Sequence, residues 1–214
     1  MPSALIVGDS HVDWTAFAKA LNTKVAALGY EVTNAGIGAT SARSWLKDKT
    51  CRPKKDKCVK VSHLQKTGPW DLVLISLGTN DAANANKAGV DAGAKTAERV
   101  KKLAAKLGGR RTIWILPPVL RGNKKWYTSK AVKTVYTHAP ESGLELFNSL
   151  PVTQEVITKK SGDGIHPGSS VGKKWAQAVG AQIQQAPSPQ GSIWMGLALV
   201  AGSWLAWTWW KRQR

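Results

Sequence analysis

The sequence contains few cysteines, few histidines and few acidic residues. Its two cysteines and four histidines among 214 residues are too few and too scattered for a zinc framework or a multi-disulfide scaffold. The 13 acidic residues stand against 31 lysines and arginines, so the formal net charge is +18 at pH 7. Such a surface attracts nucleic acid, acidic lipid headgroups or anionic polymers, although simple solubilisation explains it equally well.

No motif accompanies the charge that would specify one of these partners. The zinc-ligand spacings of DNA-binding fingers are missing, and so are the aromatic, basic strands of RNA-binding sheets. A Gly-x-Gly at residues 36–38 lacks the rest of a dinucleotide-binding fingerprint. We therefore expect no metal, no cofactor and no specific nucleic-acid partner. An anionic polymer or lipid surface remains an expected partner.

The two cysteines flank a short basic segment. Cys51 and Cys58 enclose Arg-Pro-Lys-Lys-Asp-Lys, and residues 47–66 as a whole are strongly basic, which is typical of an exposed insertion. The pair could close a surface loop as a disulfide in an oxidising compartment, or it could remain two free thiols in a reducing one. The sequence leaves both alternatives open.

Short apolar runs alternate with helical periodicity over most of the chain, which is typical of an α/β fold. The run at residues 72–75 is nearly continuous, as in a central parallel strand. We predict a three-layer α/β/α sandwich with a mostly parallel sheet of about five strands. The strands are expected at 4–8, 31–34, 70–75, 112–116 and 144–147, and the main helices at 14–28, 84–107 and 171–185.

Ser10 stands out because it follows the first predicted strand directly. Gly8 permits a tight turn there, and the turn places the Ser10 hydroxyl at the carboxyl end of the strand. Open α/β sheets bind their ligands at that edge. Most serines in such positions are turn or capping residues, so Ser10 by itself proves little.

Three further segments change that assessment when they are taken together with Gly8-Asp9-Ser10. They are Asn34-Ala35-Gly36-Ile37-Gly38-Ala39-Thr40, Gly78-Thr79-Asn80-Asp81 and Asp163-Gly164-Ile165-His166. In order and spacing the four segments resemble the four conserved blocks of the SGNH (GDSL-type) hydrolases. The resemblance covers roughly residues 4–185.

The resemblance implies a role for each of these blocks. Ser10 would be the nucleophile, His166 the general base and then acid, and Asp163 the carboxylate that orients the imidazole. A serine hydroxyl needs such a base, and a histidine needs a third group to hold its tautomer. The oxyanion hole would combine the Ser10 N–H, a glycine N–H of the second block and the Asn80 side chain.

The second block departs from the pattern of the family. Counting forward from Asn34 places the donor amide at Ala39, whereas counting back from Thr40 places it at Gly38. We favour Gly38. Alanine could also serve, because the donor is a backbone N–H.

The remaining candidates receive supporting roles. His11, His63 and His138 have no carboxylate partner at local spacing, and we expect His11 to be structural. Asp9 is expected to hold the turn before Ser10, and Asp81 is expected to support Asn80.

The chain changes character after residue 185. Residues 186–192 have the composition of a linker, and residues 193–210 contain no charged residue over 18 positions. As a helix this segment would be about 27 Å long, enough to cross a thin bilayer. Tryptophans stand at both of its ends, and the basic tail 211–214 follows. We predict a single-pass, C-terminal membrane anchor for a domain spanning residues 1–185.

Two further expectations concern the ends of the chain. Ala198, Gly202 and Ala206 recur every four residues, a spacing that favours a weak homodimer through the anchor. No signal peptide is recognisable at the N-terminus, because the apolar run there is short and matches the first strand.

These observations lead to one main hypothesis and two alternatives. The main hypothesis is a membrane-anchored serine esterase that hydrolyses an O-acyl carbohydrate or a lipid of the cell envelope. A host envelope or a virion membrane is its expected setting. The first alternative is a catalytically silent SGNH domain that binds an anionic envelope polymer or lipid. The second is an O-acyltransferase that uses the same triad.

Overall fold

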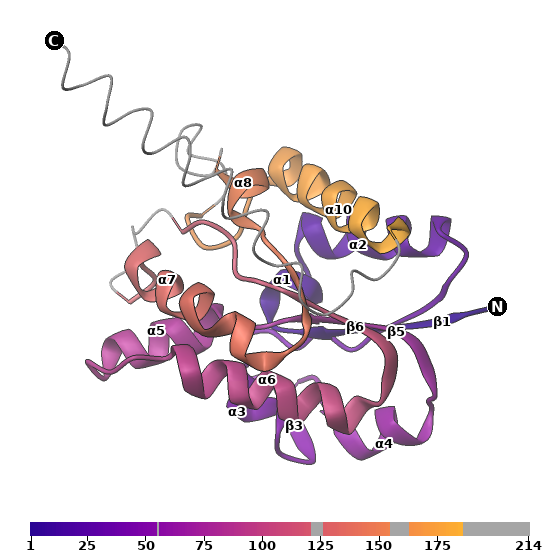
Figure 1. Cartoon of the computed structure of the whole chain (residues 1–214), viewed down its shortest axis with the longest axis horizontal. Coiled ribbons are helices and arrows are strands. Elements are labelled where there is room, and N and C mark those ends of the chain that lie inside the picture. Colours follow the sequence, from indigo (N-terminus) through magenta and orange to yellow (C-terminus); the bar gives the residue numbers. More distant parts are fainter. Residues whose placement is uncertain (55, 121–125, 155–162, 186–214) are drawn as a thin grey trace, which may run out of the picture. The chain divides into compact units, whose positions relative to one another are not determined.

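A five-stranded parallel sheet forms the centre of the protein (Figure 1). The computed structural model describes residues 1–54, 56–120, 126–154 and 163–185. The strand order in the five-stranded sheet is β2-β1-β5-β6-β7. The strands are β1 (Ser3–Gly8), β2 (Glu31–Asn34), β5 (Trp70–Ser76), β6 (Gly109–Ile115) and β7 (Glu145–Phe147). A small antiparallel hairpin contains β3 (Lys49–Cys51) and β4 (Cys58–Lys60).

Helices follow most strands, as a parallel sheet requires. Those of the first half are α1 (Ser10–Asp13), α2 (Ala16–Ala27), α3 (Ala42–Trp45), α4 (Val61–Lys66) and α5 (Thr79–Lys87). Those of the second half are α6 (Gly93–Leu107), α7 (Ser129–His138), the 3₁₀ helix η1 (Ala139–Ser142), α8 (Leu150–Thr153) and α10 (Ser169–Gln184).

The two faces of the sheet are covered by different sets of helices. Successive strand residues point to opposite faces. In β1, Leu5 and Val7 therefore join one core with residues of α3, α4, α6 and α7, whereas Ala4 and Ile6 join another with residues of α2 and α10. Figure 1 shows α2 and α10 on one side of the sheet and α3 to α7 on the other. The predicted three-layer sandwich of five strands is confirmed.

The predicted helical region 84–107 contains parts of two helices. The structure divides it between α5 and α6. Gly89, just beyond the end of α5, has a φ of +67°, a left-handed conformation that glycine adopts without steric cost and that ends a helix. The break turns the chain between the two helices and leaves space beside them.

The predicted linker 186–192, membrane anchor 193–210 and basic tail 211–214 lie outside the described residues. Among the residues that the structure does describe, none of the helices combines the length and the apolar character that a bilayer crossing needs.

Candidate active site

The turn after β1 holds Ser10 at the carboxyl edge of the sheet. Gly8 pairs with Ser76 of β5, and a Cβ at Gly8 would overlap the Ser76 carbonyl oxygen. Asp9 then caps the short helix α1, since its side chain accepts a hydrogen bond from the His11 N–H. Ser10 is thus the first residue of α1, at an edge where parallel sheets present catalytic groups.

The structure brings Ser10, His166 and Asp163 together. The Ser10 Oγ lies 2.8 Å from the His166 Nε2, and the His166 Nδ1 lies 3.0 Å from the Asp163 Oδ2. The other carboxylate oxygen of Asp163 accepts from the backbone N–H groups of Ile165 and His166, at 2.9 and 2.7 Å. These bonds fold the carboxylate back onto the imidazole, and Gly164, with a φ of +89°, permits the tight turn.

The protonation states suit a base that accepts the serine proton. Burial raises the pKa of the Asp163 carboxyl, but the hydrogen bonds from the His166 N–H, the His166 ring and the Ile165 N–H outweigh it and lower this pKa to about 2. Since an ionised carboxylate can only accept, the His166 Nδ1 donates, and the Nε2 is left to accept from Ser10. Burial and the nearby His11 lower the pKa of His166, which keeps the ring neutral.

Asn80 lies at the first turn of α5 with its side chain in the same region. Its Nδ2 donates to the Thr40 carbonyl at 2.8 Å, and its Oδ1 accepts from the Tyr127 hydroxyl at 2.8 Å. The second Nδ2 hydrogen has only a long contact, 3.5 Å from the Asp9 Oδ2. This contact is at the limit of hydrogen-bonding distance.

The backbone donors are distributed differently from the sequence-based expectation. The Ser10 N–H has no acceptor among the described residues, as is usual in the first turn of a helix. The Gly38 N–H, however, donates to the Asp13 Oδ2 at 2.7 Å. Ala39 is exposed, has a φ of +61° and shows no acceptor for its N–H within the described chain. The Gly38 N–H is therefore bound within the protein, whereas the Ala39 N–H has no such partner in the described chain.

Asp13 connects the catalytic edge to the basic hairpin, and the sequence did not single it out. Cys51 and Cys58 form a disulfide across β3 and β4. The hairpin extends Arg52 and Lys57 to the buried Asp13 carboxylate, with N–O distances of 2.7 and 2.8 Å. Burial raises the pKa of Asp13, but these two cations and the Gly38 N–H lower it below its ordinary value. The hairpin is thus attached to the site.

His11 and Asp9 form a second histidine–carboxylate pair, next to the pair of His166 and Asp163. The His11 Nδ1 lies 2.8 Å from the Asp9 Oδ1, and its Nε2 lies 3.1 Å from the Ile165 carbonyl oxygen. Both neighbours are acceptors, so both ring nitrogens donate and the imidazole is charged. Burial lowers the pKa of His11, but Asp9 and the Ile165 carbonyl raise it above its ordinary value. His11 ties the Ser10 turn to the His166 loop.

The expectation that His11 and His138 lack local carboxylate partners was wrong. Asp9 stands two residues before His11, and Glu141 stands three after His138, with an N–O distance of 2.6 Å. The sequence signal for the His11 partner was the Asp-x-His spacing of Asp9 and His11 across the start of a helix. The expected structural role for His11 agrees with its contacts.

Trp14 provides an exposed aromatic surface beside His166. The predicted helix 14–28 includes it, but α2 begins only at Ala16 and Trp14 is 55% exposed. Its ring centroid lies 4.6 Å from that of His166. The described residues contain no group of three histidine, cysteine or acidic side chains arranged to hold a metal ion.

Comparisons with known proteins agree with this architecture. No family model matches the chain, and no curated protein matches it in sequence. A lipase/acylhydrolase from Enterococcus faecalis matches in structure with a TM-score of 0.65 and 19% identity, over 87% of this chain and 100% of that one. A catalytic mutant of an acetylxylan esterase from Geobacillus stearothermophilus matches with a TM-score of 0.60 and 17% identity, over 87% and 97%. A candidate SGNH hydrolase from Slackia heliotrinireducens matches with a TM-score of 0.61 and 15% identity, over 85% and 98%. The chain therefore has the fold of the SGNH hydrolases.

Proposed function

We propose that this protein is a serine ester hydrolase of the SGNH type. The observation that carries the proposal is the continuous hydrogen-bonded chain from the Ser10 hydroxyl through the His166 ring to the Asp163 carboxylate. Ser10 and His166 lie 156 positions apart in sequence. Together they supply a nucleophile, a neutral base and a group that orients the base.

The geometry supports a two-step reaction. The Ser10 Oγ attacks the ester carbonyl carbon while the His166 Nε2 takes its proton, and the carbonyl oxygen becomes an oxyanion. The donors that we assign to it are the amides of Ser10 and Ala39 and the Asn80 Nδ2. The C–O bond then breaks, His166 protonates the departing alcohol, and the acyl group remains on Ser10. Water, deprotonated by His166, attacks the acyl-enzyme, and the acid is released as Ser10 regains its proton.

The surroundings of the triad favour an O-acyl carbohydrate or a lipid of the cell envelope as substrate. Trp14 offers an exposed apolar surface next to His166. Arg52 and Lys57 both contact Asp13, and Lys57 also donates to the Gly36 carbonyl. The net charge of +18 suits an anionic polymer or membrane surface. The name of one structural neighbour, an acetylxylan esterase, supports the carbohydrate class.

The catalytic proposal is tested with short-chain p-nitrophenyl esters and a fluorophosphonate probe on the full chain. Wild type should turn over the esters and become labelled, whereas Ser10→Ala should do neither. Loss of one triad member lowers kcat by roughly 10⁴- to 10⁶-fold. Ser170→Ala is the matched control, because it removes an exposed serine hydroxyl at the start of α10.

Two other outcomes would change the assignment. A wild-type chain without turnover or labelling would contradict hydrolysis and favour a domain that only binds anionic polymer or lipid. An added sugar that receives the acyl group faster than water does would identify an O-acyltransferase.

We also propose that residues 193–210 anchor this hydrolase in a membrane. The support is the 18-residue uncharged segment with tryptophans at both ends and the basic tail 211–214. The full chain should stay in the membrane fraction after an alkaline carbonate wash. A Leu199→Arg/Val200→Arg variant should be released, because each charge at mid-span costs about 2.5–3.5 kcal/mol. Retention of that variant would contradict the anchor.

A further inference from the structure

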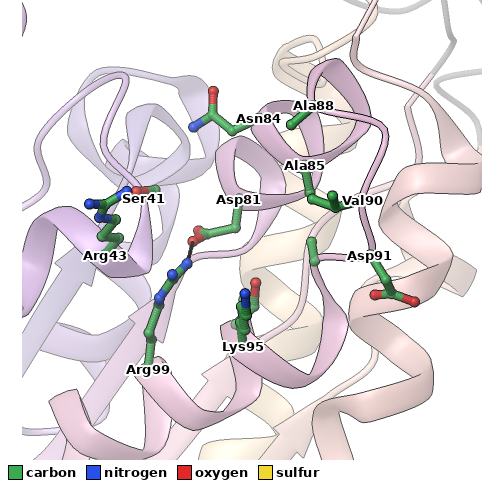
Figure 2. A pocket seen from close by; sticks show the side chains of 12 residues that line it. Ser41, Arg43, Asp81, Asn84, Ala85, Ala88, Val90, Asp91, Lys95 and Arg99 are labelled. Atoms are coloured by element: carbon green, nitrogen blue, oxygen red, sulfur yellow. Dashed lines mark ion pairs between the residues drawn. The ribbon is translucent and has the colours of Figure 1, made fainter.

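A cavity of about 330 Å³ lies among α3, α5 and α6, and its lining does not include Ser10, His166 or Asp163. Its walls include the start of α3, residues along α5 from Asp81 to Ala85, and the first half of α6 (Figure 2). The break in the chain around Gly89 separates α5 from α6 and so helps to form this space. The volume is at the low end of the roughly 300–1,000 Å³ typical of small-molecule sites.

Three cationic side chains line the cavity. Arg43 extends from α3, and Lys95 and Arg99 extend from α6 (Figure 2). Two carboxylates, Asp81 and Asp91, also line it. Asp91 is engaged by the Gly93 N–H, whereas neither Arg43 nor Lys95 has a side-chain hydrogen bond or ion pair within the described residues. Two cationic head groups are therefore open to an anionic ligand.

Two buried polar atoms on the wall of the cavity lack a hydrogen-bond partner in the described structure: the Asp81 Oδ1 and the Thr96 Oγ1. The Asp81 side chain is 2% exposed, and its Oδ1 lies 3.8 Å from the Arg99 Nη1, too far for a hydrogen bond. The other Asp81 oxygen accepts from the Ala42 N–H at 2.9 Å. Buried polar groups are nearly always hydrogen-bonded. The Asp81 Oδ1 has only its ion pair with Arg99, and the Thr96 Oγ1 has no partner in the described structure, so both atoms can take a further hydrogen bond.

The protonation state of Asp81 determines whether a further partner must donate or accept a hydrogen bond. Burial raises its pKa to about 6, against the effects of the Ala42 N–H and Arg99. Near neutral pH most of the carboxyl groups are ionised, and the Oδ1 then needs a donor. The Thr96 hydroxyl can donate or accept. A ligand hydroxyl satisfies both atoms.

We propose that this cavity is a binding site for an acidic sugar, a monosaccharide unit with a carboxylate or phosphate group. The anionic group lies between Arg43 and Lys95, and sugar hydroxyls pair with the Asp81 Oδ1 and the Thr96 Oγ1. Asp81 directly follows Asn80, so the first turn of α5 contributes to both this site and the candidate active site. The proposal is independent of ester hydrolysis.

The test is isothermal titration calorimetry on the full chain with four probes: D-glucuronate, D-glucose 6-phosphate, D-glucose and inorganic phosphate. At least one of the two acidic sugars should bind, and the better binder identifies the anionic group. D-Glucose lacks the charge and inorganic phosphate lacks the sugar hydroxyls, so each should bind at least about tenfold more weakly.

Variants test whether the measured heat comes from binding in the cavity. Lys95→Gln and Arg43→Gln should each weaken acidic-sugar binding by about tenfold, whereas Lys101→Gln, which removes an exposed charge from the same helix, should leave it unchanged. Thr96→Val should weaken binding without lowering the melting temperature, because its hydroxyl has no partner in the described protein. Ser10→Ala should bind like wild type.

Three results would overturn the proposal. The first is a lack of binding by both acidic sugars at millimolar concentration. The second is equal binding of inorganic phosphate and the acidic sugars. The third is unchanged binding in Lys95→Gln and in Thr96→Val. That result would mean that bound water, and not a ligand, pairs with the Asp81 Oδ1 and the Thr96 Oγ1.

Discussion

Replacing His11 by phenylalanine removes the charged partner of a buried carboxylate while roughly preserving ring shape. His11 and Asp9 are each 1% exposed, and their side chains meet at 2.8 Å. After the substitution Asp9 keeps the N–H of residue 11 at 3.0 Å and a long contact to Asn80 at 3.5 Å. The Ile165 carbonyl loses its donor from the ring.

The expected loss of stability follows from that geometry. Removing one partner of a buried ion pair costs about 3–5 kcal/mol, since the other charge stays buried without compensation. The remaining backbone hydrogen bond places His11→Phe at the lower end, about 3 kcal/mol. A domain of ordinary stability, about 5–15 kcal/mol, survives this loss.

Urea unfolding followed by tryptophan fluorescence measures the effect, and His63→Phe is the control because His63 is exposed on α4. The control should change the free energy of unfolding by no more than about 0.5 kcal/mol. In an Asp9→Asn background, His11→Phe should cost at least about 1 kcal/mol less than in wild type, because the buried charge is already gone.

The pH dependence of stability has a definite sign. The folded-state pKa of His11 is raised, so the pair stabilises the fold fully below the unfolded-state pKa near 6.5 and less as pH rises through the folded-state pKa. Between pH 6 and pH 9 wild type should therefore lose more stability than His11→Phe. A cost below about 1 kcal/mol in the urea experiment, or equal losses of stability across this pH range, would refute a charged His11.

Three further outcomes are expected of the same protein. In a plot of kcat/KM against pH, the inflection on the acid side should lie below pH 6.5, because burial and His11 lower the pKa of His166. Asp163, with a pKa of about 2, stays ionised throughout. An inflection above pH 7 would contradict this. Asn80→Ala should lower kcat by roughly 10²- to 10³-fold with little change in KM, measured on p-nitrophenyl esters, whereas an effect on KM alone would make Asn80 a substrate-binding residue. Cys51→Ser/Cys58→Ser should lower the free energy of unfolding by about 2–3 kcal/mol, the chain-entropy value for so short a loop; a reductant should then affect wild type and leave the variant unchanged.

The sequence by itself was sufficient for the layers of the fold. Strands buried on both faces must be apolar at nearly every position, and residues 4–8 and 72–75 show this pattern without any tertiary information. The sequence pattern did not predict the break between two helices that depends on the single residue Gly89. The alanine- and lysine-rich segment 84–107 has high helix propensity, and only the left-handed conformation of Gly89 shows that two helices are formed.

The sequence also placed Ser10, Asp163 and His166 in one hypothesis, and the structure brings them within hydrogen-bonding distance. Asp163 and His166 are three residues apart, so their pairing is local and visible in the sequence. Gly38 and Ala39 could not be separated in this way. Which amide is free depends on Asp13, which lies 25 residues from Gly38 in the chain.

The tertiary structure alone decided the contacts between charged groups distant in sequence. Arg52 and Lys57 reach Asp13 across 39 and 44 residues, and His11 reaches Ile165 across 154. The reason is physical: burial and secondary structure follow from local apolar periodicity, whereas an ion pair or an unpaired buried oxygen depends on which surfaces the packed layers bring together. The cavity beside Asp81 belongs to this second class, because its polar atoms lie on helices whose separation follows from the turn at Gly89.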